Sequence, residues 1–79
     1  MQLKNLVKLR SILRTILEIS DDDKVEFVQQ ITFRRWDSLA QVMMVAAIES
    51  EFKVCITGSE SERITSFSAI QLLLEEKGL

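Results

Sequence analysis

A chain of 79 residues forms one small domain and leaves no room for a second hydrophobic core. Apolar residues make up 47% of the sequence and proline is absent, which argues against disorder and favours a compact helical domain. The net charge of −2 is unevenly distributed, because residues 1–17 carry four cations and no acid, whereas residues 18–79 carry twelve acids and six bases. Four cations along one helix are typical of a solvated face, so we expect no nucleic-acid partner.

Residues that usually carry catalysis or bind metals are scarce. The chain has no histidine, so it lacks the commonest general base, and zinc sites built from histidine and cysteine are excluded. Two isolated glycines exclude a glycine-rich phosphate loop. Cys55 is the only cysteine and lies in an apolar run, which predicts a buried, inert thiol rather than a disulfide. We therefore expect a protein that is not an enzyme and holds no metal.

The first segment has the apolar periodicity of a helix. Its leucines and isoleucines recur at steps of three and four residues: Leu3, Leu6, Leu9, Leu13, Ile16 and Leu17. The pattern stops at the acidic run 21–23, which lacks the glycine and spaced ligands of a calcium loop and predicts a solvated turn.

Residues 20–36 have no clear period. Periodicity alone leaves a short strand at 31–33 open, but a single short strand without a partner is unstable. We expect a long loop with one helical turn, held on the core by Phe27, Ile31 and Phe33.

A second helix is predicted to begin at Asp37 or Ser38, since either residue is a good N-cap, and to run to about Phe52. Of the eleven residues from 38 to 48, only Ser38 and Gln41 are polar. The core-facing positions that we predict are Met44, Val45, Ile48 and Phe52. The other apolar residues cannot all be buried in so small a domain, which indicates an exposed partner-binding face unless a neighbouring loop covers it. The residues that cannot all be buried are Val42, Met43, Ala46 and Ala47.

The rest of the chain predicts two further helices. An apolar connector at 54–56 and a break at 57–59 precede a short helix within 60–66, with Ile64 and Phe67 facing inward. The last helix spans about 68–77, turns Ile70, Leu73 and Leu74 to the core, and ends near Gly78. The longest apolar run, 42–48, is too short to span a bilayer and the first residues do not form a signal peptide, so we expect a cytoplasmic protein.

Ser38 is the one side chain whose position suggests chemistry. A hydroxyl at a helix N-terminus lies beside outward-pointing amides and the positive end of the helix dipole, and these groups stabilise a phosphodiester formed there. Asp37 and Ser38 alone favour a plain helix cap without chemistry.

The wider pattern resembles the acyl carrier protein family. Asp-Ser-Leu at 37–39 resembles the family's attachment motif, and 42–52 resembles its second helix. The connector at 53–56 is similar to the apolar exit from that helix, and 62–67 to the short third helix. The first and last helical segments also match, so the resemblance covers nearly the whole chain in order. The tripeptide is a weak signal alone, but tripeptide, helix and spacing together are more specific.

This resemblance implies an all-α four-helix bundle of acyl-carrier type over residues 1–79, with three main helices, one short helix and a long loop between the first and second. It implies that Ser38, flanked by Asp37 and Leu39, is the covalent attachment site of a 4'-phosphopantetheine arm donated by coenzyme A. A carrier of this kind holds an acyl group as a thioester on the thiol of the arm. The protein itself then needs no base, metal or nucleophile, which agrees with the inventory of residues.

The implied partners are a phosphopantetheinyl transferase and the acyl-loading and acyl-using enzymes of a lipid or specialised-metabolite pathway, with the carrier acting as a monomer. We expect these enzymes to contact the second helix. The residues predicted to touch them are Val42, Met43, Ala46 and Glu49.

The chain departs from the family pattern around the motif. Family members often have a glycine two residues before the aspartate-serine pair, whereas Arg35 and Trp36 lie here. Many fatty-acid carriers have acids early in the second helix, whereas this chain has Ala40, Gln41 and Met43. These differences predict a dedicated carrier whose contacts depend more on apolar packing than on charge pairs. We expect Trp36 to anchor the loop rather than to shield the arm.

Two alternatives remain open. An aminoacyl or peptidyl carrier shares the fold and the arm but differs in its cargo, and the residues do not separate it from an acyl carrier. The other alternative is a helical interaction domain that is not a carrier, in which Ser38 only caps a helix and the apolar face binds a protein.

Overall fold

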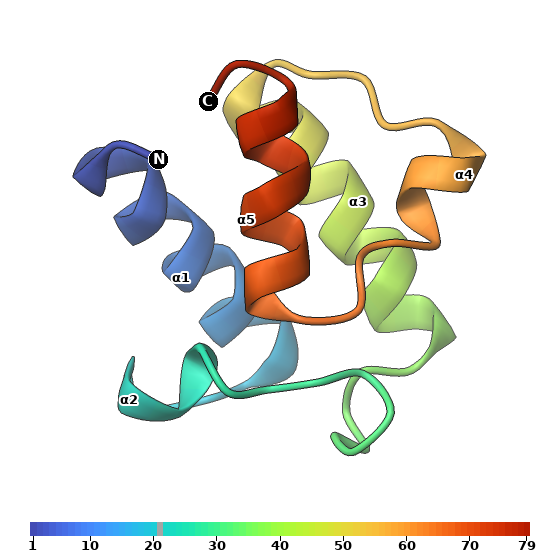
Figure 1. Ribbon diagram of the computed structural model, residues 1–79. Helices are drawn as coiled ribbons and strands as arrows, with labels where there is room; N and C mark the ends of the chain where they lie inside the picture. The colour runs from blue at the N-terminus through green and yellow to red at the C-terminus, as the bar shows by residue number, and fades with distance from the viewer. Residues whose placement is uncertain (21) are drawn as a thin grey trace.

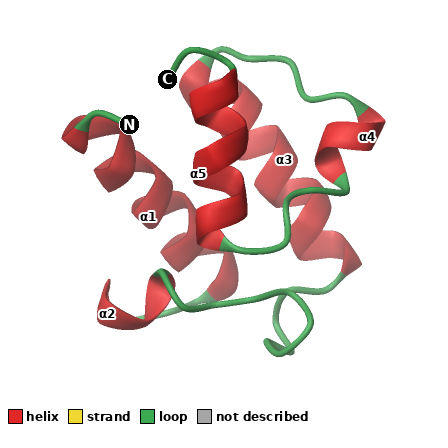
Figure 2. Cartoon of the chain, in the orientation of Figure 1, coloured by secondary structure: helices red, strands yellow, loops and turns green. Residues whose placement is uncertain are grey.

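Three long helices and two single-turn helices make up the computed structural model, which describes residues 1–20 and 22–79 except for the side chains of Asp22 and Asp23. The long helices are α1 (Leu3–Leu17), α3 (Ser38–Phe52) and α5 (Phe67–Glu76), and α1 contacts both of the others (Figures 1 and 2). The single-turn helices are α2 (Asp22–Val25) and α4 (Gly58–Ser61). The predicted all-α class is confirmed: the described residues form no strand, only an isolated antiparallel bridge between Gln29 and Ser66.

The core is built from one stripe of each long helix. α1 buries Leu9, Leu13 and Leu17 completely, at the four-residue spacing that aligns side chains on one helix face. α3 contributes four buried residues at the same spacing, and α5 adds residues at three- and four-residue steps. These residues are Ala40, Met44, Ile48 and Phe52 from α3, and Phe67, Ile70, Leu73 and Leu74 from α5.

Most predicted core positions are confirmed, with two corrections. In α1, Leu3 is exposed because it lies in the first turn, beyond the packed stretch of the helix. In α3, Val45 is only half-buried, and Ala40 is buried instead. Ile64 and Phe67 face inward as expected.

The long loop is held by different residues from those predicted. Phe27 is 81% exposed and Ile31 is 90% exposed, so the prediction that they anchor the loop is wrong, and only Phe33 is partly buried. The loop packs through Val25, Val28 and Trp36. Residues 29 and 30 pair through their backbone with 65 and 66, with the Gln30 amide donating to the Thr65 carbonyl at 2.8 Å. Because this pairing holds the chain, the neighbouring Ile31 stays in solvent.

The helical turn expected in the loop is present as α2. Of the turn predicted at 21–23, residues 22 and 23 belong to α2, and residue 21 lies outside the described residues.

The second connection also differs from the prediction. Cys55 is exposed rather than buried, because the extended chain turns its neighbours Val54 and Ile56 toward the core. The short helix begins at Gly58 rather than within 60–66. Thr57 and Glu60 form a reciprocal capping box, in which each side chain accepts a hydrogen bond from the backbone amide of the other residue. These side chains start a helix where the sequence suggested a break.

The ends of α5 follow from ordinary capping. The helix begins at Phe67 because the Ser66 hydroxyl accepts from the Ala69 amide at 3.1 Å. It ends before Gly78, whose φ of 96° lies in the left-handed region that favours glycine. No helix in the described part of the chain is long and apolar enough to cross a membrane.

The burial pattern of α3 predicts unequal effects of two truncations on the same helix. Ile48→Ala removes fully buried atoms and should lower the free energy of unfolding by about 2–5 kcal/mol. Val42→Ala removes exposed atoms and should change the free energy of unfolding by no more than about 0.5 kcal/mol. Urea denaturation, followed through the fluorescence of the single tryptophan, measures both. Equal losses would contradict the assigned core face of α3.

Acidification should weaken the fold through Glu60 and Glu76. A hydrogen bond from the Thr57 amide and the Lys77 ammonium lower the pKa of Glu60, and Arg63 lowers the pKa of Glu76. A carboxyl whose pKa is lower in the folded state contributes stability above its unfolded pKa, and this stability is lost as the pH falls through the folded pKa. We therefore expect the free energy of unfolding to fall as the pH drops below about 4.3, the ordinary glutamate pKa.

Chemical denaturation at neutral pH and at about pH 3.5 measures this fall in the free energy of unfolding for the wild type and for Glu60→Gln. The variant should lose less stability on acidification than the wild type does. Glu62→Gln is the matched control, because the exposed Glu62 carboxylate has no partner among the described residues. A Glu60→Gln variant with the full wild-type loss would contradict the assignment.

Candidate functional site

The N-terminus of α3 is formed by Asp37. Its backbone is extended, with a φ of −92°, and its carboxylate accepts a hydrogen bond from the Ala40 amide at 2.9 Å. This is the ordinary geometry of an aspartate N-cap, which satisfies one of the unpaired amides of a first helical turn. The helix therefore begins at Ser38, within the predicted range, and Asp37 is its cap.

Ser38 is left free by this arrangement. Its side chain is exposed at the first helical position, and its hydroxyl makes no hydrogen bond with any residue that the structure describes. The interpretation of Ser38 as the capping residue is therefore wrong, because Asp37 supplies the cap. The hydroxyl faces solvent at the positive end of a 15-residue helix.

Trp36 anchors the loop that leads into the site. The indole is 3% exposed, and its Nε1 donates a hydrogen bond to Oε1 of Gln41 at 2.7 Å. The Gln41 amide nitrogen donates in turn to the Ser61 carbonyl at 2.9 Å. Gln41 thus connects the loop, α3 and α4 through two hydrogen bonds. This role explains a polar residue at position 41 of an otherwise apolar stretch.

An exposed apolar surface runs along α3 beside Ser38. Leu39 is 68% exposed, Val42 is 66% exposed, and Met43 and Ala46 are also exposed. These four residues, the apolar strip, lie at the three- and four-residue steps that place side chains on one helix face. The predicted exposure of Val42, Met43 and Ala46 is confirmed, and no described loop covers them. Leu39 extends the strip and was not assigned to it from sequence.

Glu49 has a structural role in addition to the predicted contact with partners. Its side chain is half-buried, and its carboxylate accepts from the Ile56 amide at 2.9 Å. This hydrogen bond holds the apolar connector against α3. A contact between Glu49 and a partner stays a prediction, and one oxygen of the carboxylate is already engaged.

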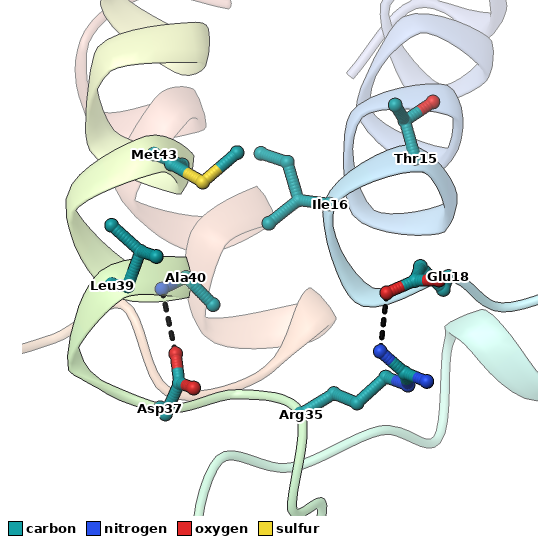
Figure 3. Close-up of a pocket in the computed structure, with 8 residues that line it drawn as sticks. All are labelled: Thr15, Ile16, Glu18, Arg35, Asp37, Leu39, Ala40 and Met43. Carbon is teal, nitrogen blue, oxygen red and sulfur yellow. Dashed lines mark hydrogen bonds and ion pairs between the residues drawn. The ribbon is translucent and has the colours of Figure 1, made fainter.

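A groove of about 370 Å³, the α1–α3 groove, lies between the last turn of α1 and the first turns of α3. Figure 3 shows Thr15 and Ile16 on the α1 side and Leu39 and Met43 on the α3 side. At one end the Arg35 guanidinium donates to the Glu18 carboxylate, an ion pair that ties the loop to the end of α1. The complete lining is Thr15, Ile16, Glu18, Arg35, Asp37, Leu39, Ala40 and Met43.

Sequence reasoning missed the α1–α3 groove because its walls come from segments about twenty residues apart. The residues that could have indicated a groove from sequence are Thr15 and Ile16, at the end of the first helix, and Arg35, which departs from the family pattern before the motif. Arg34, next to Arg35, is exposed and makes no ion pair with a described residue. The described residues contain no cluster of three metal-ligating side chains.

Comparison of the chain with family models, with curated proteins and with solved structures gave no match.

The assignment of the cap predicts a difference between neighbouring substitutions. Asp37→Ala removes the acceptor of the Ala40 amide and should lower the free energy of unfolding by about 1 kcal/mol. Ser38→Ala removes no hydrogen bond and should cost less than about 0.5 kcal/mol. Asp37→Asn keeps an acceptor oxygen and serves as the control. Chemical denaturation of the three variants measures the order, and a larger loss for Ser38→Ala would contradict it.

Proposed function

We propose that this protein is a carrier that holds an acyl group as a thioester on a 4'-phosphopantetheine arm attached to Ser38. The observation that carries the proposal is the Ser38 hydroxyl, exposed and without a hydrogen-bond partner among the described residues, at the first position of a long helix whose cap comes from Asp37. Because Asp37 already caps α3, capping does not account for the serine at position 38. The resemblance of 37–52 to the family's motif and second helix gives the chemical identity of the arm.

The site fits the attachment reaction. The serine oxygen attacks the coenzyme A phosphorus that bears the pantetheine, a new oxygen–phosphorus bond forms, and the bond to the adenosine bisphosphate leaving group breaks. In this proposal the hydroxyl proton goes to a base of the transferase. The product phosphodiester is an anion, and the positive end of α3 stabilises it.

The apolar strip supports a role in delivering cargo to enzymes. It begins at Leu39, beside the attachment residue, and offers an uncharged surface on which a partner can dock. Met43 lies within the strip, and methionine adapts to partners of varied shape. We infer contacts with Val42, Met43, Ala46 and Glu49 by a phosphopantetheinyl transferase and by the acyl-loading and acyl-using enzymes of a lipid or specialised-metabolite pathway. In this proposal the carrier acts as a monomer in the cytoplasm.

Two other functions use the same surfaces. An aminoacyl or peptidyl carrier has the same arm, so only the mass of the loaded cargo distinguishes it. The apolar strip by itself favours an interaction domain without an arm, because it requires a partner but no chemistry at Ser38.

Attachment is tested by intact mass after incubation with coenzyme A, magnesium and a broad-specificity phosphopantetheinyl transferase. We expect the wild type to gain one phosphopantetheine and Ser38→Ala to gain none, because the acceptor oxygen is missing. Ser50→Ala is the matched control, since Ser50 is another exposed serine on α3, and it should be modified like the wild type.

A folded wild-type chain that several transferases leave unmodified would contradict the proposal and favour the interaction domain. Equal modification of Ser38→Ala would place the arm on another residue.

A further inference from the structure

We propose that the α1–α3 groove is a docking site for the enzyme that modifies Ser38 and that it receives an apolar side chain of that enzyme. This inference rests on the proposed function. It adds α1 to the recognition surface and assigns a specificity role to Thr15 and Ile16, which the sequence placed only on a first helix.

The first argument is position. The enzyme that modifies Ser38 brings the phosphorus of its bound coenzyme A to about 3–3.5 Å from the hydroxyl oxygen, so the enzyme surface covers the residues around Ser38. Asp37 and Leu39, on either side of Ser38 in the chain, both line the groove. Leu39 and Met43 belong at once to the groove wall and to the apolar strip. An enzyme seated on the strip therefore also lies over the groove.

The second argument is the chemistry of the lining. Ile16, Leu39, Ala40 and Met43 supply apolar walls, and the charged side chains gather at the end that holds the Arg35–Glu18 ion pair (Figure 3). A volume of about 370 Å³ is at the lower end of the range for small-molecule sites. A space of this kind suits an inserted side chain, and residues that anchor protein interfaces fill such pockets.

The third argument is charge. At one end of the groove the Arg35 guanidinium pairs with the Glu18 carboxylate, so these two opposite charges largely offset each other. From Ser38 to Ile48, α3 carries no charged side chain. An uncharged face gives no advantage to a strongly basic or acidic partner, because the partner's charges would lose water without gaining an opposite charge. The matching surface on the enzyme is therefore apolar.

The test uses the rate at which a phosphopantetheinyl transferase modifies the full chain at saturating coenzyme A. Thr15→Phe places a large ring at the groove from an exposed position, so folding should be preserved. We expect it to raise the KM for the chain by about tenfold while kcat stays within about twofold, because docking is lost and the Ser38 hydroxyl is unaltered. Met43→Glu, which puts a charge on the same wall, should have the same effect.

Ser68→Phe is the matched control, since Ser68 is an exposed serine on α5 outside the groove, and its KM should equal that of the wild type. Raising the salt concentration from about 50 to about 300 mM should change the wild-type kcat/KM by less than about twofold. The circular dichroism of every variant confirms the fold.

Three outcomes overturn the inference. An unchanged KM for both groove variants shows that the enzyme does not use the groove, while modification of the wild type leaves the carrier function standing. A steep loss of kcat/KM with salt shows charge-dependent docking. Absence of modification of the wild type removes the carrier function and this inference with it.

Discussion

The hydrogen bond from the Ala40 amide to the Asp37 carboxylate is the interaction on which the site depends. It sets the residue at which α3 begins, and it leaves the hydroxyl of the next residue, Ser38, without a structural task. From this start, four-residue steps place Ala40, Met44 and Ile48 against the core. The same steps turn Leu39 and Met43 outward. The capping contact sets where α3 begins, and the apolar spacing of its residues sets which face is buried and which is exposed.

The approach to the site is held by polar contacts that cross between elements. Trp36 fills space in the core with its ring and passes a hydrogen bond to Gln41, which bonds to the end of α4. On the other side, Arg35 ties the same loop to Glu18 at the end of α1. The loop before Ser38 is therefore fastened on both sides of α3. This arrangement fixes the position of Ser38 at the start of α3, which the proposed attachment of an arm requires.

The long helices were predictable because their apolar spacing repeats over three or four turns. In α1 and α5 the buried leucines and isoleucines follow the predicted stripe, and α3 begins and ends where its cap and composition indicate. The loop and the connector between the long helices have no such repeating apolar spacing, so their contacts could not be predicted from it. A backbone pairing of residues 29 and 30 with 65 and 66 helps to hold the loop without Phe27 and Ile31, and no hydrophobic period reveals such a pairing. Cys55 is exposed because successive side chains of the extended segment point to opposite sides, and Val54 and Ile56 take the side that faces the core.

At the candidate site, Ser38 and the exposed α3 face followed from sequence, whereas the groove beside α1 required the packed structure. We propose that Ser38 carries a phosphopantetheine arm in the living cell. Mass mapping of the protein isolated from its own cells tests this directly, because cleavage after Arg35 and Lys53 isolates Ser38 in the peptide 36–53. We expect a phosphopantetheine on Ser38, loaded in part with an acyl group. A fully unmodified peptide from cells that use the protein would contradict it.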